Sequence, residues 1–352
     1  MTPFTFAGIS TRVIFGSGTI VQTGAEIDRL GRKGALVLST PHQKAEADAL
    51  AQRLGPQAKG IFAGAVMHTP TEVTNAALAA YAASGADCVV SLGGGSTTGL
   101  GKAIATRTGA DQIVIPTTYA GSEMTDILGE TDQGRKTTRR DASIRPETVI
   151  YDVDLTLTLP PQLTVTSALN AIAHGVEALY APDANPILSL MSVEAMRAFK
   201  AGLPRVMADP GDRAARGDVL YGAWLCSTAL GYITMALHHK LAHVLGGSFG
   251  TPHAETHAIL IPHTAGFNAV AAPDALAPVA AIFGAPVGGG LWDFARSCGA
   301  PLHLADLGLA EADLDRAAAI AVENPYANPR PFGQADIRAL LQAAWEGTRP
   351  NN

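Results

Sequence analysis

Short uncharged runs alternate with helix-like segments through the first 150 residues, and this pattern strongly limits the folds available to the chain. The runs are four or five residues long, which suits strands better than helices. They lie at residues 35–38, 88–92 and 112–115. Helical patterns over residues 43–54 and 71–84, and from a Ser96 cap to about Arg107, separate or follow them. Strands joined by helical crossovers predict a doubly wound, mostly parallel sheet.

The pattern changes near residue 157, after which we find helical segments and no convincing strand. The expected helices are 165–180, 187–202, 211–237, 239–246, 254–270, 274–283, 290–299, 304–307, 311–321 and 334–345. A polar, basic segment over 129–145 precedes the change and predicts a hairpin or loop over the sheet edge. We therefore expect a dinucleotide-binding α/β domain over 1–156 and an all-α domain over 157–352.

The net charge and the cysteine content limit which kinds of molecule the protein binds and in which cellular compartment it is expected. The net charge of −6 leaves no basic surplus to neutralise phosphates, so nucleic acid is not an expected partner. Three widely spaced cysteines provide no disulfide framework. With no signal-peptide pattern at the N-terminus, they predict a cytoplasmic protein. The uncharged segment 219–237 is interpreted as a buried central helix rather than a membrane span.

Six of the ten histidines lie between His238 and His263. His239 and His243 are four residues apart, as are His253 and His257, so each pair lies on one face if its segment is helical. Glycines and a proline between the pairs predict an elbow that turns both faces toward a shared space. Imidazoles exchange protons near neutral pH and bind metals. A set of buried, hydrogen-bonded histidines is the alternative, but four at this spacing favour a functional site.

A second polar stripe occurs on an otherwise apolar helical segment. Asn170 and His174 are four residues apart, and Glu177 follows on nearly the same face. Such a stripe is either a solvated face or the lining of a pocket. We favour a pocket that also receives the histidines of residues 239–257.

The turn Gly93-Gly94-Gly95-Ser96 stands between a predicted strand and a predicted helix. Glycines let backbone N–H groups approach a phosphate, and the helix dipole favours the anion. The spacing matches neither the GxGxxG fingerprint nor a Walker A loop, so a plain strand–helix connection is the alternative. Its position at the carboxyl end of a parallel strand favours nucleotide binding. The other predicted nucleotide-binding residues are Thr117, Thr118, Ser122, Ser39 and Lys136.

These segments together resemble the iron-containing alcohol dehydrogenase superfamily. The resemblance rests on GGGS, PTT, NAIAHGVEALY and HKLAHVLGGSFGTPHAETHAILIPH, and it covers nearly the whole chain. It implies a dehydroquinate synthase-like architecture, a nicotinamide dinucleotide and an active site between two domains. The family usually holds its metal with an Asp and three His, and those positions fall on Asn170, His174, His239 and His253. Asn170 is a departure, because a neutral amide is a poor ligand for a divalent cation.

A second departure is Gly99, where many family members have Asp. Both departures resemble one branch of this superfamily, the maleylacetate reductases. The same resemblance extends to the segments GGGSTTGLGKAIA, YAGSEMT, GRKTTRR and NPRP. This implies a homodimeric enzyme that reduces the activated C=C bond of maleylacetate to 3-oxoadipate in aromatic-compound degradation, without a metal. The predicted donor set is His243, His174, His239 and His253. The dicarboxylate substrate would need cations, and the candidates are Lys136, Lys240, Arg139, Arg140 and Arg330.

The sequence is compatible with more than one cofactor and with more than one class of reaction. The segment after residue 38, Ser39-Thr40-Pro41-His42, has no carboxylate to repel a 2′-phosphate, so we expect both NADH and NADPH to be accepted. A metal-dependent alcohol dehydrogenase with an amide ligand is the main alternative. A dehydroquinate-synthase-like lyase and a non-catalytic nucleotide-binding protein are the others.

Overall fold

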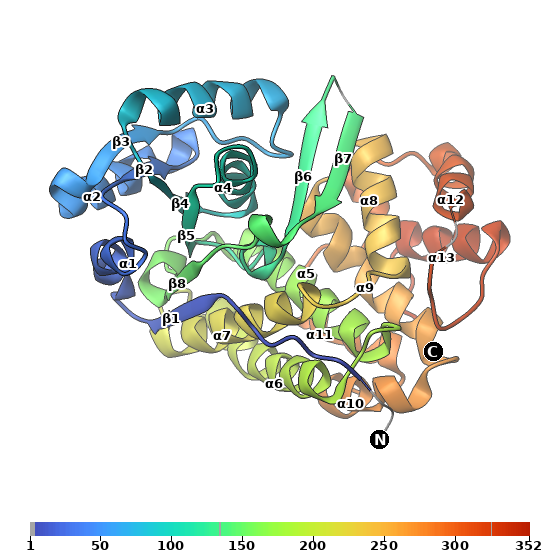
Figure 1. Ribbon diagram of the computed structural model, residues 1–352. Helices are drawn as coiled ribbons and strands as arrows, with labels where there is room; N and C mark the ends of the chain where they lie inside the picture. Colours follow the sequence, from blue (N-terminus) through green and yellow to red (C-terminus); the bar gives the residue numbers. More distant parts are fainter. Residues whose placement is uncertain (1–3, 134, 325) are drawn as a thin grey trace. The chain divides into compact units, whose positions relative to one another are not determined.

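The computed structural model describes residues 4–133, 135–324 and 326–352 and divides into two compact units (Figure 1). One unit contains residues 7–159, and the other contains residues 160–352 together with residues 4–6. The division falls three residues after residue 156, the expected end of the first domain. The assignment of a separate function to each domain stays a prediction.

The first unit is built on a six-stranded sheet. Its strands are β1 (Arg12–Gly16), β2 (Ala35–Leu38), β3 (Ala58–Phe62), β4 (Cys88–Gly93), β5 (Asp111–Pro116) and β8 (Thr148–Asp152). They are ordered β1-β8-β5-β4-β2-β3, and every neighbouring pair is parallel. The helices of this unit are α1 (Thr23–Arg29), α2 (Lys44–Leu54), α3 (Thr71–Ser84) and α4 (Gly95–Thr108). The predicted doubly wound parallel sheet is confirmed.

Both faces of this sheet are covered, which explains why its central strands are uncharged. Val37 and Val90 pack in one apolar cluster with residues of α1 and α2. Leu36 and Val89, their neighbours in sequence, pack in a second cluster with residues of α3 and α4. Successive side chains of a strand point to opposite faces. Strands buried on both sides therefore need apolar residues at every position.

Strands β6 (Ile127–Asp132) and β7 (Arg135–Arg140) form a separate antiparallel hairpin in the segment where a hairpin or loop was expected. Lys102 of α4 connects to the start of this hairpin. Its ammonium group donates to the carbonyl oxygens of Ser122, Thr125 and Ile127 at 2.5, 2.9 and 3.0 Å. Burial lowers the pKa of Lys102 to about 7. The lysine therefore ties α4 to the segment that follows Pro116.

The second unit contains helices and no strand within its described residues, as predicted. Its α-helices are α5 (Pro161–Tyr180), α6 (Pro186–Ala208), α7 (Arg213–Leu230), α8 (Leu237–Phe249), α9 (His253–Ala269), α10 (Pro273–Phe283), α11 (Val287–Ser297), α12 (Leu314–Val322) and α13 (Gln334–Glu346). The core of this unit includes buried residues of α8, α9, α12 and α13.

The two largest errors in the predicted helices of this unit lie at C-terminal ends. The expected helix 211–237 ends at Leu230, and Thr234 is held outside it by Asp183, which accepts from the backbone N–H and the hydroxyl at 2.9 and 2.8 Å. Helix α6 continues through Pro204 to Ala208 instead of stopping at residue 202. Packing compensates for the hydrogen bond that a proline loses, because Leu203 and Val206 are fully buried.

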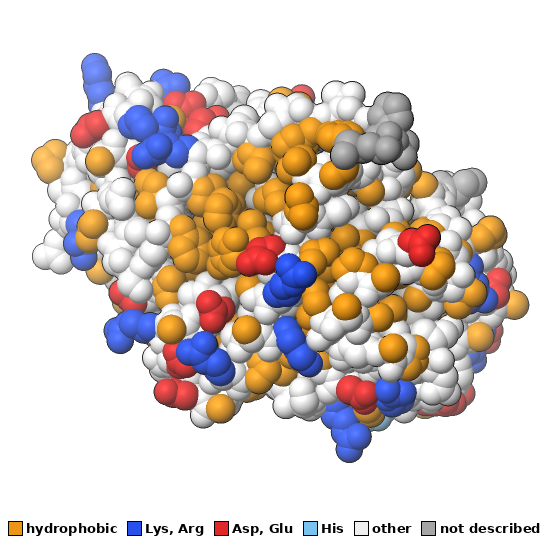
Figure 2. Space-filling model, turned by 90° about the horizontal axis from the view of Figure 1, so that it is seen from below, with side chains coloured by type: hydrophobic (Ala, Val, Ile, Leu, Met, Phe, Trp, Pro, Cys, Tyr) orange, Lys and Arg blue, Asp and Glu red, His pale blue; other side chains and the backbone are white. Residues whose placement is uncertain are grey.

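Residues 273–297 have the length and hydropathy of a membrane-crossing segment, but they do not form one helix. They consist of α10 and α11, each 11 residues long, and 44% of the apolar window is buried. A bilayer requires about 20 residues of continuous helix. On the described part of the face in Figure 2, side chains of both charges are interspersed.

The three cysteines are buried and free.

Candidate active site

The glycine turn joins β4 directly to α4. Helix α4 begins at Gly95 with Gly94 as its N-cap, so the predicted cap at Ser96 is wrong. Gly94 is extended, and its carbonyl oxygen accepts from the N–H groups of Thr97 and Thr98, both at 3.1 Å. The N–H groups at the start of a helix have no partner within the helix. The turn therefore presents the first N–H groups of α4 at a partly exposed position.

Side chains at the first two glycines would fill this turn. Gly93 has φ +150°, and a Cβ on it would lie 2.5 Å from the hydroxyl oxygen of Thr97. A Cβ on Gly94 would lie 3.0 Å from the side chain of Thr118. At both positions the space that a Cβ would need is already occupied by neighbouring side chains, so the turn requires glycine there.

The segment after β5 lies beside this turn. Thr117 donates its backbone N–H to the carbonyl oxygen of Gly93 at 3.1 Å. Its hydroxyl accepts from the amide of Gln43 at 2.9 Å, and Gln43 in turn accepts from the hydroxyl of Thr40 at 3.3 Å. Gln43 could not be predicted as part of this site, because a Gln at the start of a helix carries no sign in the sequence of a contact with Thr117. The ends of β2, β4 and β5 are therefore linked by hydrogen bonds.

The other predicted nucleotide-binding residues are Ser122, Ser39 and Lys136. Ser122 starts a short 3-10 helix and accepts from Lys102 through its carbonyl oxygen. Ser39 is fully buried, and its hydroxyl has no hydrogen-bond partner in the described part of the chain. Lys136 lies in β7, but its side chain is outside the described residues.

Gly99, where many family members have Asp, packs closely against Thr69. A Cβ on Gly99 would lie 2.5 Å from the hydroxyl oxygen of Thr69. Thr69 is buried and has φ +46°, a rare backbone conformation for a β-branched residue. An Asp at position 99 would therefore displace Thr69 from its present position.

Six histidines gather where α5, α8 and α9 meet. Ring centroids are separated by 5.1 Å for His174–His239, 6.2 Å for His239–His243 and 4.4 Å for His253–His257. His257 also lies 5.1 Å from His239. The structure thus connects the four histidines of the predicted donor set, with His257 linking His253 to the others.

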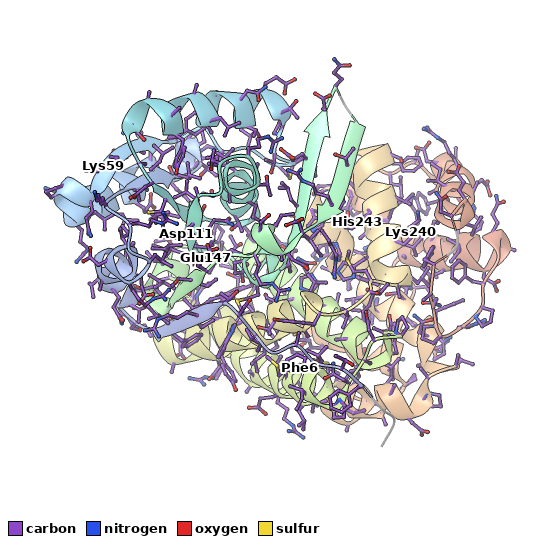
Figure 3. All side chains as sticks on the ribbon, in the orientation of Figure 1. Phe6, Lys59, Asp111, Glu147, Lys240 and His243 are labelled. Carbon is purple, nitrogen blue, oxygen red and sulfur yellow. The ribbon has the colours of Figure 1, made fainter. Side chains whose placement is uncertain are left out.

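Exposure falls from one side of this cluster to the other. His243 is exposed, and it projects from α8 near Lys240 (Figure 3). His174 and His239 are 3% and 4% exposed, and His257 is fully buried. Burial, and then the neighbouring imidazoles, lower the pKa of His174 and His257 well below the usual value for histidine. The cluster therefore has an accessible front and a buried, uncharged back.

Glu177 holds His239 from behind. Its Oε2 lies 2.6 Å from Nδ1 of His239, and its carboxylate also accepts from the backbone N–H groups of Ala236 and His238 at 3.1 and 2.8 Å. Glu177 is fully buried. An acceptor at Nδ1 directs Nε2 of His239 toward the cluster. The sequence placed Glu177 near the His174 face of its helix but gave no sign of this contact with α8.

The family's metal position holds a neutral amide where a carboxylate is usual, so it fits a divalent cation poorly. The amide oxygen of Asn170 is buried and has no hydrogen-bond partner among the described residues. It is neutral, and the nearby carboxylate of Glu177 is already occupied by His239 and backbone N–H groups. No described group of three or more His, Cys, Asp or Glu is arranged to hold a metal ion. We therefore assign no chemical step to a metal.

Four of the candidate cations for the substrate carboxylates have described side chains. Arg139 and Arg140 contact Glu130 and Asp126, at 3.4 and 3.9 Å. Lys240 lies 5.7 Å from the ring centroid of Tyr326, and the guanidinium of Arg330 lies 3.9 Å from that of Phe267. Neither Lys240 nor Arg330 has a carboxylate partner within the described residues. These two belong to the same unit as the histidines.

The segment Asn328-Pro-Arg-Pro331 is fixed to α9. Asn328 and Asn268 exchange amide hydrogen bonds at 2.9 and 2.7 Å. The amide of Asn328 also donates to the carbonyl oxygen of Arg330 at 2.7 Å. The position of Arg330 is therefore set by the helix that carries His253 and His257.

Comparisons with known proteins agree with this arrangement. Residues 10–153 match the family model for iron-containing alcohol dehydrogenase, and residues 164–345 match the C-terminal model of the Fe-containing alcohol dehydrogenase family. Maleylacetate reductase of Rhizobium sp. (strain MTP-10005) is 59% identical over 350 residues, covering 99% of this chain and 100% of the relative. Maleylacetate reductase 1 of Rhodococcus opacus is 50% identical, covering 99% and 98%. The crystal structure of maleylacetate reductase from Agrobacterium tumefaciens is 58% identical with a TM-score of 0.97, covering 99% and 100%.

Proposed function

The chain belongs to the iron-containing alcohol dehydrogenase family, and we propose that it is a maleylacetate reductase that uses NADH or NADPH to form 3-oxoadipate. The observation that carries this proposal is identity of 50% or more to maleylacetate reductases over nearly the whole chain. The histidine cluster supports it, because it offers imidazoles without the carboxylate that a metal-dependent relative would use at Asn170.

The substrate is a dicarboxylate whose carbon–carbon double bond is conjugated to a ketone. The reduced nicotinamide supplies a hydride to the carbon β to the ketone, which leaves an enolate. The protein must then stabilise negative charge on the ketone oxygen and deliver a proton to carbon. Gly93, Gly94, Gly95 and Ser96 would hold the phosphates of the dinucleotide, and Thr117, Thr118 and Ser122 would contact its nicotinamide half.

The four histidines of the predicted donor set provide the donors. His243 is the general acid, because it is the exposed member and lies beside His239. His174, His239 and His253 donate to the developing enolate. The carboxylate of Glu177 accepts from Nδ1 of His239 and fixes the orientation of this ring.

The substrate carboxylates require cationic partners, and Lys240 and Arg330 fit best. Lys240 lies on α8 between His239 and His243, and Arg330 is fixed to α9 through Asn328 and Asn268. Arg139 and Arg140 are less suited, because acidic side chains already contact them. A guanidinium binds a carboxylate through two parallel hydrogen bonds, which adds orientation to charge.

The enzyme accepts both NADH and NADPH. The end of β2 leads into Ser39, Thr40 and a 3-10 helix at Pro41–Gln43, with no carboxylate in this segment. Thr40 is only partly buried and contacts Gln43. A difference of more than about a hundredfold in kcat/KM between the two nucleotides, which is about 2.7 kcal/mol, would contradict this.

The protein acts in the cytoplasm as a homodimer. Strand β1 is at one edge of the six-stranded sheet, and its open edge is available for pairing with a second chain. Light scattering of the purified protein during size exclusion tests this, and a monomer at micromolar concentration would contradict it.

The deciding experiment is NADH consumption with maleylacetate after removal of metals by a chelator. Rapid turnover supports both the reaction and the metal-free mechanism. Turnover that appears only after iron or zinc is added would contradict the metal-free mechanism and leave the substrate assignment standing. Absence of turnover under both conditions, with activity on simple alcohols, would favour a metal-dependent alcohol dehydrogenase.

A further inference from the structure

Thr264, His238 and His257 form a chain of hydrogen bonds at the buried back of the cluster. Nδ1 of His238 lies 2.9 Å from the hydroxyl oxygen of Thr264, and Nε2 of His238 lies 2.8 Å from Nδ1 of His257. All three residues are fully buried. Nε2 of His257 has no hydrogen-bond partner among the described atoms. Both ring nitrogens of His238 and one of His257 are thus engaged.

The Thr264 end of this chain of hydrogen bonds fixes the direction in which all of its bonds run. The Thr264 hydroxyl lies 3.0 Å from the carbonyl oxygen of Leu260 and donates to it, so it accepts from the Nδ1–H of His238. His238 then has a lone pair at Nε2, which accepts from the Nδ1–H of His257. The opposite direction would lose the bond to Leu260, worth about 1 kcal/mol. It would also leave a buried N–H on His257 without an acceptor, which is rare in native proteins.

The chain holds a ring in place and does not conduct protons to solvent. It ends at a backbone carbonyl of α9, which cannot pass a proton onward. His257 is the central ring of the cluster, with centroids 4.4 Å from His253, 5.1 Å from His239 and 6.5 Å from His174. A rotation of this ring would therefore disturb all three.

We propose that Thr264 and His238 are positioning residues that hold His257 in one orientation, with hydrogen on Nδ1 and a lone pair on Nε2. The rings of His253 and His239 pack against this fixed ring and keep their angle to the substrate. His257 itself gives no proton to the substrate, so stabilisation of negative charge is left to His174, His239, His243 and His253. The kinetic part of this inference rests on the proposed reductase function.

The first test is the tautomer itself. Nitrogen-15 NMR of the full chain labelled at histidine, without substrate, distinguishes a protonated from an unprotonated ring nitrogen. We expect the signals of His238 and His257 each to show hydrogen on Nδ1 only. His257→Asn serves to assign the signals. Hydrogen on Nε2 of His257 would overturn the proposal, whatever reaction the enzyme catalyses.

The second test uses variants of Thr264. Thr264→Val keeps the shape and removes the hydroxyl, and Thr264→Ser keeps the hydroxyl. We expect kcat for maleylacetate reduction to fall about tenfold in Thr264→Val with little change in KM, and to recover in Thr264→Ser. The NMR signals of His238 and His257 should lose their single tautomer only in the valine variant.

Thr228→Val is the matched control. Thr228 is also fully buried in a helix and donates to a carbonyl four residues earlier, that of Trp224, at 2.9 Å. It lies on α7, and we expect wild-type kcat and one tautomer for each ring. An equal fall of kcat in Thr228→Val and Thr264→Val, or an unchanged kcat in Thr264→Val, would overturn the positioning role. Lack of wild-type turnover would instead reject the reductase function and leave the NMR test valid.

Discussion

Oε2 of Glu177 lies 2.6 Å from Nδ1 of His239, and both side chains are buried. The pair joins α5 to α8 and gives one ring of the predicted donor set an anionic partner. Glu177→Gln removes the charge beside His239 and keeps one oxygen, which can accept from the backbone N–H of Ala236 or of His238 but not from both. We expect kcat to fall about 10- to 100-fold, as for loss of a residue that orients an imidazole. Steady-state kinetics with maleylacetate would measure this.

The control for Glu177→Gln is the same substitution at Glu194 of α6, whose side chain is 50% exposed. Thermal unfolding of both variants separates a kinetic effect from a folding defect. If Glu177→Gln retained wild-type kcat, His239 would act without an anionic partner.

Asn170→Asp should make stability depend on a divalent cation. The amide oxygen of Asn170 is buried without a hydrogen-bond partner, so a carboxylate there would carry an uncompensated charge. That charge costs several kcal/mol unless a cation binds. We expect the Tm of the chelator-treated variant to fall and to recover with Zn²⁺, while the Tm of the wild type does not respond. An equal rise in Tm on adding Zn²⁺ to the wild type would contradict the poor fit of Asn170 to a metal.

Lys102→Met should reveal a pH-dependent part of the stability. Burial lowers the pKa of Lys102 from 10.5 to about 7. Between these values the unfolded chain binds a proton that the folded protein releases, so the free energy of unfolding rises with pH. We expect the wild type to gain about 1.4 kcal/mol per pH unit relative to Lys102→Met across this window. Urea unfolding from pH 7 to 10 would measure it, and a difference independent of pH would show that Lys102 keeps its proton.

Thr40→Asp should convert a dual nucleotide preference into a preference for NADH. A carboxylate after β2 would accept from the ribose hydroxyl and repel a 2′-phosphate. We expect kcat/KM with NADPH to fall at least about tenfold, or 1.4 kcal/mol, while the value with NADH changes little. Thr40→Asn, which has the same shape without the charge, is the control. Equal losses with both nucleotides would place the 2′-position away from Thr40.

The sheet was predictable because its information is local. Residues 35–38 and 88–92 are uncharged over a strand length, and burial on both faces is what requires that composition. The pairs His239–His243 and His253–His257 were likewise readable from helical spacing. Local periodicity failed where a distant contact decides the structure. The helix expected over 211–237 ends at Leu230, and Asp183 holds Thr234 outside it.

The partners of the histidines could not be predicted for the same reason. Glu177 and His239 are 62 residues apart, and their contact depends on how α5 packs against α8. The pair His238–His257 depends similarly on the packing of α8 against α9. Helical spacing tells which residues share a face, but it does not tell which face of another helix they meet.

His243→Ala tests the assignment of the general acid. His243 is the exposed member of the cluster, and its ring lies 6.2 Å from that of His239. Removing it should lower kcat about a hundredfold or more, because the step that protonates carbon loses its acid. NADH binding, measured by fluorescence, should be unchanged, since the glycine turn belongs to the other unit. His303→Ala, an exposed histidine beside Asp306, is the control. An unchanged kcat in His243→Ala would remove this residue from the mechanism and leave the proton to come from His174, His239 or His253.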